Sequence, residues 1–351
     1  MELKRSASVV IILVAVVGII IGSWVLLKDS VVEHTLSSKI SLNILFSHHQ
    51  LATDLPLSLF QERLRESDIF LMEYPTWSAD WEEDMNRVSQ GILSPQEFFS
   101  KRQTSEEAAK STFQFLDLQL NALYKSGVFV TSVDLQANDP LGNKINEYVP
   151  VMNQTQLYTD FYETLKLQRK KYEYWTGLQT ERQQYMVDRF VELIDVINNR
   201  KIPAIKEKPE IRILYVLGSN HVRVYDLLKE RGINVSKEYS HTPYTYDYPG
   251  EATIKFINGE DISDELLANG LFQTELLNGF GLPWVYDEEK STRLIRKITS
   301  QFTFDELKNI FVAMANSRSP ESMFKQMVTA SAKEKNIMIP VTRQEFDNLD
   351  I

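Results

Sequence analysis

Two segments of the 351-residue chain share one pattern of hydrophobic and polar positions: an apolar run, an amphipathic stretch and a second apolar run. In the first segment, SLNILFSHH at 41–49 and DIFLMEYP at 68–75 flank a predicted helix near 56–66. Apolar runs this short, bounded by turn residues, are typical of buried β-strands. Because a strand-helix-strand connection links parallel strands, the pattern predicts a parallel pair.

The second segment repeats this pattern further along the chain. IRILYVLGSNH at 211–221 predicts a strand, which a helix at 222–231 and a strand near 233–239 follow. The first strand of each segment ends in Ser-x-His, at His49 and at His221. The two segments therefore read as equivalent halves of one sheet, with both histidines at the same edge.

The rest of the chain is mostly helical in its periodicity. A strand closing near Asp134 precedes residues 154–199, which predict one long helix, or two helices with a break at Gly177. Residues 239–260 are rich in Tyr, Pro, Asp and Gly and predict a loop over the sheet. The part from about 262 onward predicts helices. We expect an α/β fold with a central, mostly parallel or mixed sheet, flanking helices and a helical C-terminal extension.

The amino terminus predicts a membrane anchor. Residues 9–27 carry no charge and are long enough to span ~30 Å of hydrocarbon as a helix. Basic residues on the short leading side place residues 1–8 in the cytoplasm and the rest outside. No small-x-small cleavage site follows, so an uncleaved signal anchor is preferred over a cleaved signal peptide. Residues 28–40 read as a tether, and residues 41–351 as the extracytoplasmic domain.

Composition narrows the function classes. The chain has no cysteine, which excludes disulfides and thiolate chemistry. Its net charge of -10 argues against nucleic-acid binding, since a nucleic-acid-binding surface clusters Lys and Arg. The expected partners are the membrane, through the N-terminal helix, and a small-molecule or peptide substrate.

Four predicted strand ends carry residues capable of chemistry: His49, Glu73, Asp134 and His221. In an open parallel sheet, ligands bind beyond the carboxyl ends of the strands, so these side chains are expected to converge. Two imidazoles with carboxylates suit a divalent metal such as Mn, Co or Zn. Without a metal, the same set provides an acid-base pair acting on water. Arg182, in the helix segment ERQQYM, either clamps an anionic substrate group or orients a site carboxylate.

Structural interpretations stand beside these functional ones. His221 alone reads as a hydrogen-bonded core histidine, and the matching end at His49 tips the balance toward a site. Asp134 precedes Gln-Ala-Asn-Asp-Pro and also fits the start of a turn. Arg182 fits a structural salt bridge as well as a contact with substrate.

The order of these motifs resembles the superfamily that contains the TraB/GumN proteins, the Tiki proteases, the erythromycin esterases and the ChaN haem-uptake lipoproteins. The resemblance rests on Ser47-His48-His49, on DIFLMEYP with Glu73, on ERQQYM with Arg182, and on LGSNH with His221. It covers residues 41–240, and Phe46 stands where the first motif should have glycine.

This resemblance implies a membrane-anchored hydrolase of peptides or esters. In that hypothesis His49, His221, Glu73 and Asp134 hold a metal, Glu73 or His221 acts as the base, and Arg182 steadies negative charge. The ChaN resemblance implies a different class, a surface protein that binds haem or another small ligand. A third interpretation is a degenerate member that serves only as an interaction module.

Overall fold

The computed structural model describes nine stretches of the chain. They are residues 40–47, 57–74, 78–103, 114–152, 155–199, 201–240, 247–280, 288–340 and 342–349. Within these stretches, no helix combines the length and the apolar character needed to cross a membrane. The predicted anchor at 9–27 and nearly all of the tether lie outside them, so the membrane span stays a prediction.

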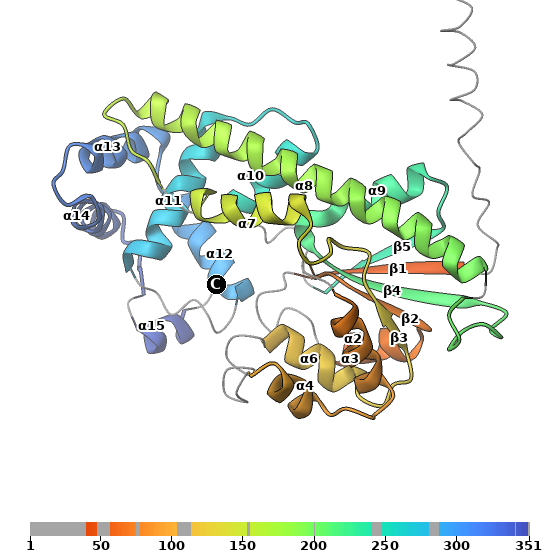
Figure 1. Cartoon of the computed structure of the whole chain (residues 1–351). Coiled ribbons are helices and arrows are strands. Elements are labelled where there is room, and N and C mark those ends of the chain that lie inside the picture. The colour runs from red at the N-terminus through yellow and green to blue at the C-terminus, as the bar shows by residue number, and fades with distance from the viewer. Residues whose placement is uncertain are drawn as a thin grey trace, which may run out of the picture. The chain divides into compact units, whose positions relative to one another are not determined.

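The core of the fold is a five-stranded sheet in which every strand pair is parallel (Figure 1). Its strands are β1 (Ile40–Ser47), β2 (Ile69–Met72), β3 (Phe129–Thr131), β4 (Ile211–Gly218) and β5 (Val235–Tyr239). Their spatial order is β3-β2-β4-β1-β5. The predicted α/β fold with a parallel sheet is therefore confirmed.

The two predicted strand-helix-strand units interleave instead of lying side by side. Helix α2 (Leu57–Arg65) connects β1 to β2, and helix α9 (Val222–Glu230) connects β4 to β5. However, β4 lies between β1 and β2, and β1 lies between β4 and β5. This order makes the first strands of the two units neighbours, and Ser47 is the register partner of Gly218. Ser47 and Ser219, the first residues of the two Ser-x-His segments, thus lie at the ends of adjacent strands.

Helices cover both faces of the sheet (Figure 1). On one face lie α2 and three further helices, α3 (Ala79–Ser89), α4 (Pro95–Lys101) and α6 (Gln114–Leu123). The sheet residues buried against these helices are Leu45, Phe70, Met72, Val130, Leu214 and Val216. On the opposite face lie α9 and the 38-residue helix α8 (Phe161–Asn198). Because strand side chains alternate, Tyr215 and its neighbours at every second position point toward α8.

The C-terminal part is helical, as its periodicity predicts. Its helices are α10 (Tyr248–Ile257), α11 (Asp264–Phe280), α12 (Glu288–Thr299), α13 (Phe304–Ala315), α14 (Pro320–Glu334) and α15 (Arg343–Asp347). They share an apolar core with the first half of α8, to which Phe161 and Leu165 contribute. One more helix, α7 (Pro140–Met152), packs along α8. This arrangement makes α8 the element common to the sheet and the helical part.

Of the two alternatives for 154–199, the structure has the single long helix. Helix α8 runs through Gly177 without a break, because buried residues on both sides of the glycine hold the helix against other elements. One local prediction needs correction. The predicted loop at 239–260 contains helix α10. The Asp247 side chain caps this helix by accepting a hydrogen bond from the Gly250 N–H, and a proline occupies its first turn. The turn-forming residues here start a helix.

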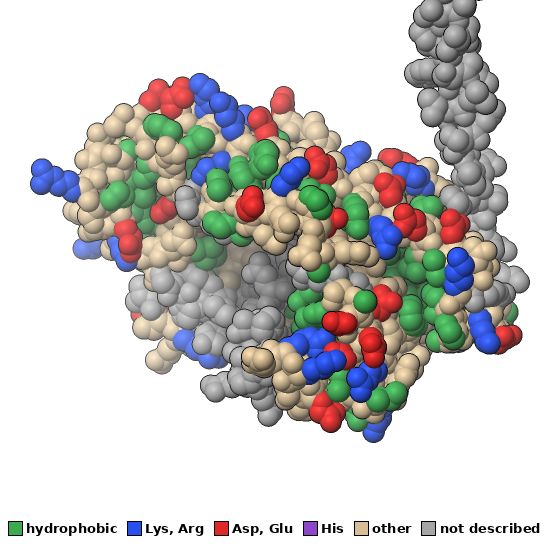
Figure 2. Space-filling view, viewed as in Figure 1, with side chains coloured by type: hydrophobic (Ala, Val, Ile, Leu, Met, Phe, Trp, Pro, Cys, Tyr) green, Lys and Arg blue, Asp and Glu red, His purple; other side chains and the backbone are tan. Residues whose placement is uncertain are grey.

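Acidic and basic side chains are interspersed over the helices on the face that Figure 2 shows. Many are paired on the surface, for example Arg231 with Asp188 and Lys325 with Glu321. This mixture differs from the clustered Lys and Arg of a nucleic-acid-binding face.

Candidate functional site

Glu73, Asp134, Arg182 and His221 form a polar cluster at the carboxyl edge of the sheet, beside the point where the connections between strands change direction. The chain leaves β1 through α2 on one face and leaves the adjacent β4 through α9 on the other face. Such a switch point opens a crevice between the carboxyl ends of the two strands, where ligands bind in parallel α/β sheets. The Ser219 hydroxyl donates to the Ser47 carbonyl across it, at 3.2 Å. The order of the strands therefore identifies the carboxyl ends of β1 and β4 as the edge of the sheet where a ligand is expected to bind.

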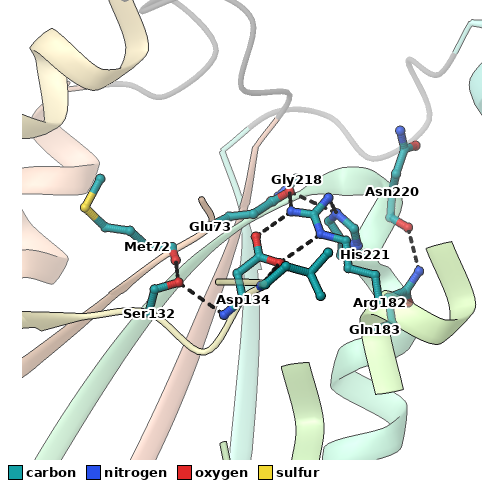
Figure 3. Close-up of polar contacts among 10 residues, drawn as sticks. Met72, Glu73, Ser132, Asp134, Arg182, Gln183, Gly218, Asn220 and His221 are labelled. Atoms are coloured by element: carbon teal, nitrogen blue, oxygen red, sulfur yellow. Dashed lines mark hydrogen bonds and ion pairs between the residues drawn. The ribbon is translucent and has the colours of Figure 1, made fainter. Parts of the chain in front are cut away.

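Glu73 is the centre of this cluster (Figure 3). It follows β2 directly, and its side chain is 10% exposed. Its Oε2 accepts a hydrogen bond from the backbone N–H of Gly218 at 2.5 Å. Its Oε1 accepts a hydrogen bond from Nη2 of Arg182 at 3.0 Å. Oε1 also lies 2.9 Å from Nε2 of His221. Three donors therefore surround the carboxylate and stabilise its negative charge.

Arg182 enters the cluster from α8 and joins two carboxylates. Its Nε and Nη2 contact the two carboxylate oxygens of Asp134 at 2.9 and 2.5 Å, and the same Nη2 reaches Glu73. Burial lowers the pKa of Arg182, but the charges of Asp134 and Glu73 outweigh it and hold the pKa above the ordinary arginine value. The guanidinium is therefore a permanent buried cation. The alternative in which Arg182 orients a site carboxylate is the one this geometry favours.

Asp134 is almost completely buried, with 1% of its surface exposed. It lies in the loop after β3, and its Oδ1 also accepts the Leu135 N–H at 2.8 Å. Ser132 fixes this loop to the end of β2, because its hydroxyl accepts the Asp134 N–H and donates to the Met72 carbonyl. Asp134 thus lies in the loop after β3, as the turn reading predicts, and contacts Arg182 in the cluster, while its role at a site stays a prediction.

His221 closes the short 3₁₀ turn η2 (Ser219–His221) that follows β4, and 4% of it is exposed. A carboxylate only accepts hydrogen bonds, so in the neutral ring the 2.9 Å contact with Glu73 favours the tautomer with the proton on Nε2. The Arg182 Nη1 is further from Nε2, at 3.4 Å. Nδ1 then carries the lone pair. It is buried and has no hydrogen-bond partner among the described residues.

Gly218 allows the close approach of backbone and carboxylate. A Cβ atom at this position would lie 3.2 Å from Oε2 of Glu73 and 3.6 Å from the His221 ring. The first distance is tighter than ordinary van der Waals contact, so a side chain here displaces the carboxylate. The glycine of LGSNH therefore has a steric role that its position at a strand end alone does not reveal.

Sequence reasoning missed Tyr215 and Gln183. The Tyr215 ring is fully buried under the cluster, and its hydroxyl has no partner in the described part of the chain. Burial raises its pKa well above the ordinary value, and the charges of Asp134 and Glu73 raise it further. Gln183, beside Arg182 on α8, is also fully buried. A tyrosine inside an apolar strand and a glutamine inside a helix give no local signal of a site.

The structure brings together Glu73, Asp134, Arg182 and His221, four of the five predicted site residues. The fifth, His49, lies outside the described residues. Within the described stretches, no three His, Asp or Glu side chains are placed to hold one metal ion. Both oxygens of Asp134 are bound by the guanidinium, so this donor set fits an arginine cation better than a metal. Metal binding stays a prediction.

The chain matches no protein-family model, no curated protein and no solved structure. The resemblance to the TraB/GumN, Tiki, erythromycin esterase and ChaN superfamily therefore rests on the sequence motifs. Three of the residues that carry those motifs, Glu73, Arg182 and His221, are in mutual contact.

Proposed function

We propose that the protein is a hydrolase that uses His221 as its general base, acting on an ester or peptide substrate. The observation that carries this proposal is the 2.9 Å contact between Nε2 of His221 and Oε1 of Glu73. This contact favours the tautomer in which Nδ1 of His221 accepts a proton. In hydrolytic triads, a carboxylate likewise holds one ring nitrogen of the imidazole while the other ring nitrogen accepts a proton. Because Glu73 already accepts bonds from Gly218 and Arg182, it suits the orienting role better than the role of base.

The charge of the cluster supports this division of roles. Glu73 and Asp134 are two anions and Arg182 is one cation, so the cluster carries one net negative charge when the imidazole is neutral. This charge stabilises the imidazolium that forms when Nδ1 takes a proton. It also repels phosphate or carboxylate at the reacting position, which favours a neutral carbonyl compound. Arg182 and Asp134 act as positioning residues for Glu73.

In the proposed reaction, Nδ1 of His221 removes one proton from water, and the water oxygen attacks the carbonyl carbon. The bond from that carbon to the leaving oxygen or nitrogen breaks, and Nδ1 returns the proton to the leaving atom. Each turnover consumes one water and restores the neutral imidazole. The predicted signal anchor places this reaction outside the cytoplasm. Protease treatment of intact cells tests that location, and full protection of residues 41–351 would contradict it.

The test of function uses the full-length protein in detergent against panels of p-nitrophenyl esters and of peptides. We expect turnover by the wild type, no turnover by His221→Gln, and about 10²- to 10⁴-fold lower kcat in Glu73→Gln, the range general acid-base groups contribute. Asp188→Asn, on the exposed face of α8, is the matched control and should keep full activity. Unchanged turnover in His221→Gln would remove this residue from the mechanism.

A binding function gives a different result in the same preparation. Without hydrolysis of any panel member, a co-purifying small ligand or a Soret band on adding haem would replace the hydrolase proposal. We rank this function second, because the contact between His221 and Glu73 suits acid-base chemistry.

A further inference from the structure

Two buried acceptors, one on α8 and one in η2, have no hydrogen-bond partner among the described residues: Oε1 of Gln183 and Nδ1 of His221. Gln183 is fully buried, and 4% of His221 is exposed. Buried polar atoms in native proteins are hydrogen-bonded to protein or to ordered water, because leaving one unpaired destabilises the fold. Two unpaired atoms at one junction therefore need a common explanation.

The identity of both atoms as acceptors follows from their neighbours. Nε2 of Gln183 lies 3.3 Å from the Asn220 carbonyl, and a carbonyl only accepts, so the amide nitrogen must face it. Turning the amide over would place two acceptors against each other. Oε1 is thus the atom left over, just as Nδ1 is left over when Nε2 of His221 faces Glu73.

The two acceptors belong to the same contact between α8 and η2. The Gln183 amide reaches Asn220, and His221 is the next residue along the chain (Figure 3). A molecule that satisfies both must offer two donor hydrogens to atoms that are themselves buried. Water does so, and buried waters in proteins typically bridge groups of this kind.

We infer that a water molecule binds between Oε1 of Gln183 and Nδ1 of His221 and is the nucleophile of the reaction. The binding site rests on the geometry of the two acceptors, and the role as nucleophile rests on the proposed hydrolysis. One hydrogen of the water points to the amide oxygen, which orients it. The other points to the imidazole and is the proton that Nδ1 removes as the water oxygen attacks the carbonyl carbon. Gln183 is then a catalytic residue, because it touches the reacting water.

The decisive variant is Gln183→Met, which keeps the length of the side chain and removes its amide. Gln179→Met is the matched control, because Gln179 is a buried glutamine one turn earlier on α8 with no unpaired buried atom. Crystals of the full-length wild type should show a water within hydrogen-bond distance of both acceptors, and Gln183→Met should lose it. With an ester substrate, Gln183→Met should lower kcat about 10²-fold, as loss of reactant positioning does, and leave KM within about twofold. Gln179→Met should change neither constant.

The crystal structures and the kinetic constants together distinguish failure of this inference from failure of the proposed function. A wild type that hydrolyses esters while Gln183→Met retains its kcat would overturn the role of Gln183 and leave the hydrolase proposal standing. A bound water without turnover on any substrate would keep the site and overturn its catalytic role. An electron-density peak with the anomalous signal of a metal at this position would overturn the water assignment itself.

Discussion

Replacing Arg182 by methionine tests how strongly the buried charges depend on one another. Methionine keeps most of the side-chain volume, so the change chiefly removes the cation. Asp134 then keeps its bond from the Leu135 N–H, and Glu73 keeps its bond from the Gly218 N–H, but both lose their charged partner. Removing one partner of a buried ion pair costs about 3–5 kcal/mol, because the remaining charge is left without compensation. We expect a loss of this size in the free energy of unfolding at neutral pH.

The control is an arginine–aspartate ion pair at the surface. Arg231 contacts Asp188 at 2.9 Å with both side chains about half exposed, whereas the side chain of Arg182 is 8% exposed and that of its partner Asp134 is fully buried. Arg231→Met should therefore lose about 0–1 kcal/mol, the usual value for a solvated pair. Urea unfolding of both variants, followed by tryptophan fluorescence, measures the difference. Equal losses in the two variants would show that burial does not strengthen the Arg182 contacts and would refute the electrostatic account of the cluster.

Three further predictions address single features of the fold. Gly218→Ala should displace the Glu73 carboxylate and lower esterase kcat by about 10²-fold, since small misplacements of catalytic groups have effects of that size, with the steady-state rate as readout. Tyr215→Phe should leave the free energy of unfolding unchanged or raise it by about 1–3 kcal/mol, because it removes an unpaired buried hydroxyl; a clear loss in urea unfolding would reveal a hidden partner. Burial raises the pKa of Asp84, but hydrogen bonds from two neighbouring cations outweigh it and lower the pKa. The stabilisation is therefore complete above the unfolded-state pKa of about 3.9 and is lost as pH falls through the folded-state value. Asp84→Asn should accordingly destabilise by about 1.5–3 kcal/mol at pH 7 and by much less in strong acid, as urea titrations at the two pH values will show.

The convergence of the site residues was predictable because parallel strands end at one edge. Glu73 and His221 are 148 positions apart, yet each follows a short apolar run that had to be a buried strand. The order of the strands was not predictable in the same way. Nothing in the local pattern says that β4 lies between β1 and β2, since this order depends on how long-range contacts compete across the whole sheet.

Local propensity left the structure open at Gly177 and misled at 239–260, because tertiary packing and capping decide the structure there. Gly177 weakens an isolated helix, but α8 buries residues along most of its length, and this packing outweighs the preference of one glycine. The residues Asp247, Tyr248, Pro249 and Gly250 are as suitable for a turn as for the first turn of a helix. Only the apolar positions that follow them distinguish the two, and that periodicity over ten residues is short.

Whether Arg182 has a structural or a functional role is judged by comparing the ion pairs of the buried aspartates. The comparison asks whether the cation that pairs with each aspartate is itself buried. The aspartates buried among the described residues are Asp68, Asp84 and Asp134. The lysine that pairs with Asp68 is half exposed, and one cation at Asp84 is more than half exposed, so these pairs anchor loops and helix ends near solvent.

Asp134 differs, because its cation is itself buried and is shared with Glu73. A buried ion pair is weak evidence for stability, since apolar residues of similar volume in its place are often as stable. Buried charges that hold one another in fixed positions are instead concentrated at functional sites. The Arg182 cluster stands at the carboxyl edge where a parallel sheet binds ligands, and stability alone does not account for it.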